Sequence, residues 1–254
     1  MFLPENLNSA MRSIPLQESE WSAKVENLKP QLTSFLSESI DDELLRSIVT
    51  GSLKELSLEG LPVTDQDLKI LLSYCPLLEF CDLSECTLLT DEGINQLSLP
   101  NIKHLFLRGL PLLKGNFLDH LATFTNLETL DLSQTNLKFT NLHKLKHLNH
   151  LNVLYFWQCR QLKDQDLEWL REKNLKVLDV SYCTSLTDKC TSMLVGVKTI
   201  FLDGVNYISD KGLDPLIHSP QLEKISLYRC RRITETAIHS FPEKVIVEHQ
   251  FSKH

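Results

Sequence analysis

The sequence lacks the features of membrane-spanning and secreted proteins. No run of about 18 apolar residues occurs, so no transmembrane helix is expected. Residues 1–14 lack a basic start followed by a long apolar stretch, so no secretory signal is predicted there. These absences favour a protein of the cytoplasm, with the nucleus as an alternative.

Paired cysteines are also missing. Seven cysteines are present, an odd number, and none forms a C-x-x-C pair. A disulfide framework or a zinc site is therefore not predicted, and free thiols are typical of a reducing compartment. No metal ion and no other cofactor is expected.

Positive charge is in deficit. The chain has 26 Lys and Arg against 33 Asp and Glu, which gives a formal net charge of -7. Binding to nucleic acid or to an anionic membrane requires an excess of basic side chains on one surface. Neither partner is therefore expected, although a local basic patch is compatible with this balance.

Catalytic and nucleotide-binding motifs are absent as well. The sequence has no Walker, Rossmann, H-E-x-x-H or G-x-S-x-G pattern. A histidine cluster, His143, His147 and His150, has Lys144 and Lys146 between its members and no acid or cysteine that would complete a metal site. We therefore predict that the protein is not an enzyme.

A repeat of 22–25 residues occupies most of the chain. Eight copies of the pattern L-x-x-L-x-L-x-x-C begin at residues 53, 78, 102, 127, 151, 175, 197 and 222. The alternation in L-x-L predicts a short strand in each copy. Most second halves begin with Thr or Ser and an acid, as in Thr90-Asp91, and this pair predicts the start of a helix.

A single strand–helix unit cannot bury its apolar face alone. Stacked units make a continuous core, with parallel strands on a concave side and helices on a convex side. The sequence therefore predicts an α/β solenoid with one interior row formed by Leu56, Cys81, Leu105, Leu130, Leu154 and Leu178. Another position inside the core should be structural and filled by the recurring thiols of Cys86, Cys159, Cys183 and Cys230.

Two segments carry a family resemblance. Residues Cys86–Ile94 read C-T-L-L-T-D-E-G-I, and Tyr74-Cys75-Pro76 precedes a predicted strand. Both resemble the cysteine-containing leucine-rich repeats of the F-box/leucine-rich-repeat family, over about residues 53–240. The resemblance implies a right-handed βα horseshoe arc and substrate recognition for ubiquitin ligation. Copies three and four depart from it, because Leu110 and Thr135 replace the cysteine.

The predicted repeats leave two flanking segments. Residues 1–52 should form a helical N-terminal cap, since Trp21, Val25 and Leu28 are helically spaced. The alternative is a degenerate F-box-like segment that docks onto a ubiquitin-ligase adaptor, because residues 3–7 read L-P-E-N-L. Residues 53–240 would hold the eight repeats, and residues 241–254 a capping strand and a tail.

The concave face is the predicted binding surface. Side chains between the leucines of each strand point away from the core. Many are aromatic, where a lone domain would carry polar groups, and aspartates lie between them. The candidate partner-binding residues are Phe106, Arg108, Asp131, Tyr155, Trp157, Asp179, Tyr182, Phe201, Asp203, Tyr228 and Arg229.

Two interpretations of this surface stay open. Aromatic and arginine side chains are enriched in binding hot spots, and the interleaved acids favour a protein or peptide with basic residues. Alternatively, the rings pack on each other along the sheet. The sequence thus predicts a protein–protein interaction scaffold, with a bacterial effector acting in the host cytosol or a permanent subunit of a larger complex as alternatives.

Overall fold

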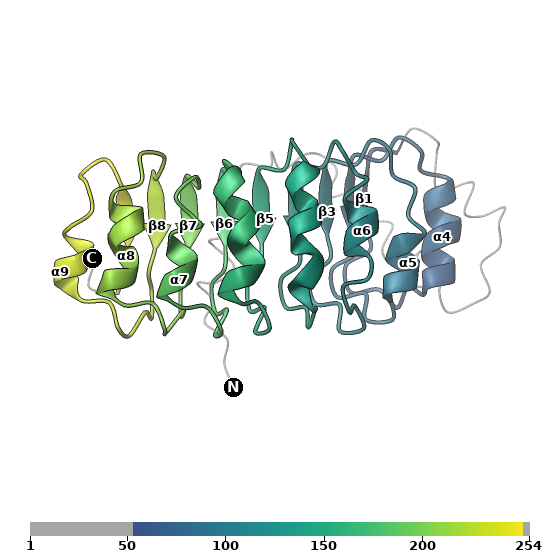
Figure 1. Ribbon diagram of the computed structural model, residues 1–254. Coiled ribbons are helices and arrows are strands. Elements are labelled where there is room, and N and C mark those ends of the chain that lie inside the picture. Colours follow the sequence, from purple (N-terminus) through teal and green to yellow (C-terminus); the bar gives the residue numbers. More distant parts are fainter. Residues whose placement is uncertain (1–52, 251–254) are drawn as a thin grey trace. The chain divides into compact units, whose positions relative to one another are not determined.

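The computed structural model describes residues 53–250, all of which belong to one compact unit of the chain. The predicted N-terminal cap, with its F-box-like alternative, lies outside the described residues. The described part consists of stacked coils, each a strand, a turn and a helix, with the helices in a row along one face of the sheet (Figure 1). We number the coils 1 to 8 after their strands.

The strands form one parallel sheet whose order follows the chain. Each strand has three residues and pairs with the next. The described strands are β1 (Glu55–Ser57), β2 (Phe80–Asp82), β3 (His104–Phe106), β4 (Thr129–Asp131), β5 (Val153–Tyr155), β6 (Val177–Asp179), β7 (Thr199–Phe201), β8 (Lys224–Ser226) and β9 (Ile246–Glu248).

The helices cover one face of this sheet. This arrangement confirms the predicted α/β solenoid. The α-helices are α4 (Asp65–Ser73), α5 (Asp91–Asn95), α6 (Leu118–Leu121), α7 (Asp188–Thr191), α8 (Asp210–Ile217) and α9 (Glu235–Ile238). Coils 4 and 5 carry 3-10 helices instead, η1 (Phe139–His147) and η2 (Asp164–Glu172). No helix within residues 53–250 has the length and apolar character needed to cross a bilayer.

The predicted interior row is confirmed by the strand register. Leu56 pairs with Cys81, Cys81 with Leu105, and the row continues through Leu130 and Leu154 to Leu178 and beyond. The side chains of this row are buried throughout coils 1 to 8. Because the side-chain period of a strand is two, this register commits the alternate positions to the opposite face of the sheet.

The recurring cysteines are structural, as predicted. The Sγ atoms of Cys86, Cys159, Cys183 and Cys230 each donate to a carbonyl oxygen of the preceding coil, over 2.9–3.1 Å. Burial raises the pKa of the Cys86 and Cys159 thiols to about 12. All seven cysteines of the chain are free and buried, including Cys75 and Cys190.

Aspartates at the helix starts connect neighbouring coils. Asp188 accepts hydrogen bonds from the backbone N–H (2.6 Å) and the hydroxyl (2.7 Å) of Ser209 in the next coil. The same pair of bonds joins Asp164 to Thr187 over 2.8 and 2.6 Å. It also joins Asp65 to Thr90 and Asp210 to Thr234. We call these contacts the aspartate ladder.

A glycine makes room for the ladder in two coils. A Cβ atom at Gly212 would lie 2.2 Å from Oδ1 of Asp188, and one at Gly93 would lie 2.1 Å from Oδ1 of Asp65. No side chain fits at either distance. The glycine of the T-D-x-G motif is therefore explained by the close approach of the preceding coil.

The ladder changes in the middle of the array. Asp91 accepts hydrogen bonds from the backbone N–H groups of Lys114 (2.8 Å) and Asn116 (3.0 Å), with no hydroxyl involved. Coils 3 and 4 have Gly115 and Phe139 where the other coils have the acid. Their connection is instead a backbone hydrogen bond from Lys138 N–H to Lys114 O, 3.2 Å long.

Strand β9 lies beside β8 at the C-terminal end of the described sheet. It pairs in parallel, and Lys224 of β8 forms an ion pair with Glu248 of β9 at 2.8 Å. This strand occupies the region where the sequence predicts a capping strand. The division of the chain into cap, repeats and tail stays a prediction.

Candidate functional site

The face of the sheet opposite the helices, here called the open sheet face, presents regular rows of side chains. The first row comes from the first residue of each strand. The second row comes from the last residue of each strand: Ser57, Asp82, Phe106, Asp131, Tyr155, Asp179, Phe201, Ser226 and Glu248. The third row lies two residues further on: Glu59, Ser84, Arg108, Ser133, Trp157, Ser181, Asp203 and Tyr228. The turn row follows at once: Gly60, Glu85, Gly109, Gln134, Gln158, Tyr182, Gly204 and Arg229.

Aspartates and aromatic rings alternate along the second row from β2 to β7. Each aspartate bonds within its own coil: Oδ1 of Asp82, Asp131 and Asp179 accepts the N–H of the serine two residues later, at 2.8–2.9 Å. Burial raises the pKa of Asp131 to about 6 and that of Asp179 to about 7. The row therefore carries less negative charge at neutral pH than the sequence suggests.

Two of the predicted contact residues are not accessible. Asp131 is 1% exposed and Tyr155 is 6% exposed, although both occupy outward positions on their strands. Phe106 is half-buried and packs against Phe80, with ring centroids 5.3 Å apart. In coils 2 and 3 the rings therefore pack on each other, which was the alternative interpretation of the sequence.

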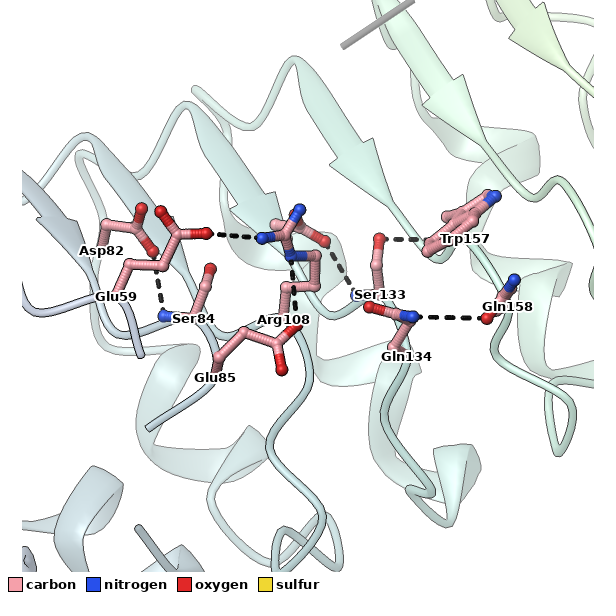
Figure 2. A network of polar contacts seen from close by, with 10 residues as sticks. Glu59, Asp82, Ser84, Glu85, Arg108, Ser133, Gln134, Trp157 and Gln158 are labelled. Carbon is pink, nitrogen blue, oxygen red and sulfur yellow. Dashed lines mark hydrogen bonds and ion pairs between the residues drawn. The ribbon is translucent and has the colours of Figure 1, made fainter. Parts of the chain in front are cut away.

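Arg108 is held by acids of the preceding coils (Figure 2). Its Nη2 donates to Oε1 of Glu59 at 2.6 Å, and its Nε lies 3.9 Å from Oε1 of Glu85. Farther along, the backbone N–H of Trp157 donates to Oγ of Ser133 at 3.1 Å. Because its charge is already paired, Arg108 belongs to an internal network rather than to a free contact surface.

Phe201 and Asp203 also have internal partners. The half-buried ring of Phe201 lies below the Lys224 ammonium, which is 5.7 Å from the ring centroid. Asp203 accepts the hydroxyl of Ser226 at 2.6 Å and the N–H of Tyr228 at 2.8 Å. Both side chains are therefore held by neighbouring residues and are not free contact groups.

Of the five remaining predicted residues, Asp179 is half-buried in the second row, and the other four lie in coils 5 to 8. Trp157 and Tyr182 meet edge to face, with ring centroids 6.4 Å apart. Nη1 of Arg229 donates to the hydroxyl of Tyr182 at 3.3 Å, and Tyr228 is 40% exposed. We call Trp157, Tyr182, Tyr228 and Arg229 the Trp157 cluster. Aromatic and arginine side chains of this kind are enriched in protein-binding hot spots.

The turn row has a backbone conformation that sequence reasoning missed. Every turn-row residue has a positive φ, between 56° and 74°. Glycine adopts this conformation freely, whereas any other residue loses roughly 1 kcal/mol or more. Recurring glycines at residues 60, 109 and 204 were the available signal. At the positions of Tyr182 and Arg229, a glycine would therefore adopt the backbone conformation at a lower cost in free energy.

Gly204 positions the tyrosine of the cluster. A Cβ atom at Gly204 would lie 2.6 Å from Cδ1 of Tyr182, so the tyrosine ring rests directly on this glycine. The ring thereby crosses coil 7 and reaches Arg229 of coil 8. Within residues 53–250, the buried indole Nε1 of Trp157 has no hydrogen-bond partner.

The helix side offers no comparable chemistry. A pocket of about 320 Å³ lies between η1 and η2, with His143 and Trp169 in its lining. His143, His147 and His150 are exposed. Among the described residues, no three His, Cys, Asp or Glu side chains are grouped as a metal ion would require.

Comparison with known proteins identifies the fold. No protein-family model and no curated protein matches the chain. The crystal structure of internalin C2 from Listeria monocytogenes is similar, with 22% identity and a TM-score of 0.56 over 88% of this chain and 92% of that one. TLR13 in its complex with ssRNA13 is 17% identical with a TM-score of 0.60; the match covers 87% of this chain but only 32% of TLR13. These likenesses show the leucine-rich-repeat fold.

Proposed function

We propose that this protein is a scaffold that binds a protein or peptide partner on its open sheet face, through the Trp157 cluster. A rigid sheet presents the cluster, so little conformational entropy would be lost when a partner binds. Tyrosine and tryptophan also supply large contact areas with few rotatable bonds. Function in a repeat protein resides in such sites rather than in the fold.

The observation that carries the proposal is the gathering of aromatic and arginine side chains in the Trp157 cluster, in which Tyr228 and Arg229 are exposed. Tyr182 and Arg229 also hold φ near 60°, at a position that three other coils fill with glycine and three fill with Glu85, Gln134 and Gln158. Backbone strain of this kind is concentrated at functional sites, because selection for the side chain offsets its cost. Because five of the eight turn-row residues carry this strain, it supports the proposal only together with the aromatic and arginine surface that Tyr182 and Arg229 add to the cluster.

The indole of Trp157 is a further unusual feature of the cluster. Buried polar atoms normally have hydrogen-bond partners, and a buried N–H without one costs about 1–3 kcal/mol. Within the described part of the chain no acceptor reaches Nε1 of Trp157. Nε1 of Trp169, on the helix side, is in the same state, so the unpartnered indole does not distinguish the two sides of the solenoid.

Basic residues in the partner remain part of the proposal. Asp179 is half-buried in the second row, between Tyr155 and Phe201 of the neighbouring strands. A Lys or Arg side chain close to this carboxylate would favour its ionised form. Because burial raises the pKa of Asp179 to about 7, binding of a basic partner should strengthen as the pH rises through that value.

The narrower biological roles depend on other parts of the chain. Recognition of substrates for ubiquitin ligation would require residues 1–52 to dock onto a ligase adaptor. If they do, deletion of residues 1–45 should remove a co-purifying adaptor and leave the partner of the Trp157 cluster bound. A bacterial effector would bind its host partner through the same cluster.

Affinity capture with matched variants tests the proposal. The double variant Trp157→Ala with Tyr228→Ala should lose the partner that the wild-type chain retains. Leu77→Ala with Leu88→Ala is the control, because both leucines are similarly exposed, at 46% and 47%, on other parts of the surface. The proposal fails if the cluster variant keeps its partner, or if both variants lose it while remaining folded by circular dichroism.

A further inference from the structure

Three consecutive coils carry a lysine in the connection where the other coils carry Thr or Ser. Five coils place Thr or Ser before the first helical residue: Thr64, Thr90, Thr187, Ser209 and Thr234. Coils 4 and 5 place Lys138 and Lys163 there, whereas in coil 3 the residue before α6 is Phe117 and Lys114 lies three residues earlier. The position of Lys114 is equivalent because Asp91 accepts its N–H at 2.8 Å, as Asp65 accepts that of Thr90 at 2.9 Å. Lys138 and Lys163 directly precede η1 and η2.

These lysines lie side by side on one edge of the solenoid, where strands lead into helices. The backbones of Lys114 and Lys138 are joined by the 3.2 Å hydrogen bond between their coils. Lys163 holds the equivalent place one coil further on, and adjacent strands of a sheet are about 4.8 Å apart. Arg160 lies in the same connection as Lys163. We call Lys114, Lys138, Arg160 and Lys163 the basic strip.

The charges of the basic strip are unpaired. All four side chains are exposed. Within residues 53–250, no acid lies within ion-pair distance of any of them. Three carboxylates beside the strip have other bonds: Asp91 accepts the backbone N–H groups of Lys114 and Asn116, Asp164 accepts from Thr187, and Asp166 accepts the backbone N–H of Lys163 at 2.9 Å.

Such an arrangement does not favour the folded chain by itself. Loss of a Thr or Ser cap costs about 1 kcal/mol in a helix, which applies to η1 and η2, where a lysine directly precedes the helix. Like charges on adjacent coils also repel one another, because the separation is shorter than the roughly 8–10 Å over which salt screens. Departures from the local rules of a fold are expected at functional sites. The basic strip therefore indicates a ligand that supplies negative charge.

We propose that the basic strip binds a short acidic segment of a polypeptide, rich in Asp or Glu. The strip runs from coil 5 towards coil 3, whereas the Trp157 cluster runs from coil 5 towards coil 8. Four cations match a few carboxylates, while proteins that bind DNA through its backbone often contact about 6–10 phosphates. The net charge of -7 also opposes a long polyanion but leaves a short segment accessible.

The test uses a fluorescein-labelled octaglutamate peptide and fluorescence polarisation at low ionic strength. The strip variant is the triple Lys114→Thr, Lys138→Thr and Lys163→Thr, which restores the residue type of the other coils. The control variant is the triple Lys69→Thr, Lys146→Thr and Lys211→Thr. It removes the same charge from exposed helix positions.

We expect the wild-type chain to bind the peptide, and the strip variant to bind it about tenfold more weakly. The control variant should change the affinity less than about threefold. Equal losses in the two triples would overturn the proposal, because they would reflect net charge alone. So would the absence of binding by the wild-type chain. Tighter, strip-dependent binding of a single-stranded oligonucleotide of equal charge would likewise overturn it in favour of a nucleic acid.

Discussion

Coils 6 to 8 and coils 3 and 4 share one interior row but are joined by different polar contacts. In the C-terminal group, an aspartate of each coil bonds the cap residue of the next, and Cys183 and Cys230 bond carbonyl oxygens across coils. Between coils 3 and 4 the aspartate contact is replaced by one backbone hydrogen bond, from Lys138 N–H to Lys114 O, and lysines stand where the other coils have Thr or Ser. The apolar row therefore specifies stacking, whereas the polar contacts between coils are free to vary where another surface is needed.

The largest effect should come from breaking the ladder at Asp188. Asp188→Ala removes two charge-assisted hydrogen bonds to Ser209, so the free energy of unfolding should fall by about 2–3 kcal/mol. Urea unfolding followed by circular dichroism measures this change. The exposed Asp214 provides the control, because Asp214→Ala should change stability by less than about 0.5 kcal/mol. Equal changes in the two variants would show that the ladder does not hold the coils together.

A pH-dependent effect is expected at Asp131 in the central group. Burial raises the pKa of this carboxyl from 3.8 to about 6, so the folded state binds its proton more tightly than the unfolded state. Ionisation therefore lowers stability as the pH rises from about 4 to about 7. Asp131→Asn has no carboxyl group to ionise, so only the wild type loses stability. The free energy of unfolding of the variant, relative to that of the wild type, should therefore rise by about 1–3 kcal/mol over that range.

Unfolding curves at both ends of the pH range would check this expectation. Asp214→Asn is the matched control, because that carboxylate is exposed. A difference between Asp131→Asn and the wild type that stays constant with pH would contradict the burial of Asp131 as an ionisable group.

Restoring a threonine in the central group should strengthen it. In Lys114→Thr the new hydroxyl would lie beside Asp91, as the hydroxyl of Thr90 lies beside Asp65 at 2.6 Å. We expect a gain of about 1 kcal/mol in the free energy of unfolding. Lys69→Thr, which removes an exposed charge elsewhere, should give no gain. A destabilised Lys114→Thr variant would show that coil 3 cannot adopt the ladder geometry.

The smallest effect concerns the turn row. Gln158 has a φ of 57°, so Gln158→Gly should relieve about 1–2 kcal/mol of backbone strain while losing about 0.5–1 kcal/mol to the greater freedom of the unfolded chain. A net gain of about 0.5 kcal/mol is expected by thermal unfolding. Gly204→Ala should instead destabilise the protein, because its Cβ would collide with Tyr182. A Gln158→Gly variant less stable than the wild type would contradict this account.

The repeat made much of the fold predictable from the sequence. Period-two leucines determined the strands and their interior row, and the Thr-Asp pairs marked the helix starts at Asp65, Asp91 and Asp188. The aspartate ladder was not predicted, since it joins residues 21–25 positions apart whose approach depends on how closely the coils stack. A role at the start of its own helix already accounts for each of these aspartates. The sequence therefore contains no separate signal for their hydrogen bonds to the next coil.

The candidate site was predictable only in part. Alternation in the strands predicts which side chains point towards the open sheet face, but it does not reveal which of them neighbouring coils cover. Asp131 and Tyr155 are buried, and Arg108 is paired with Glu59. The positive φ of Tyr182 and Arg229, shared by every residue of the turn row, depends on the turn geometry and was not predicted.

Site-specific photo-crosslinking tests the central claim most directly. A benzoylphenylalanine placed at Tyr228, on the open sheet face, should crosslink the captured partner. The same group placed at His143, exposed on the helix side, should not. A partner crosslinked from position 143 and not from position 228 would contradict the account, because the helix side would then be the binding surface.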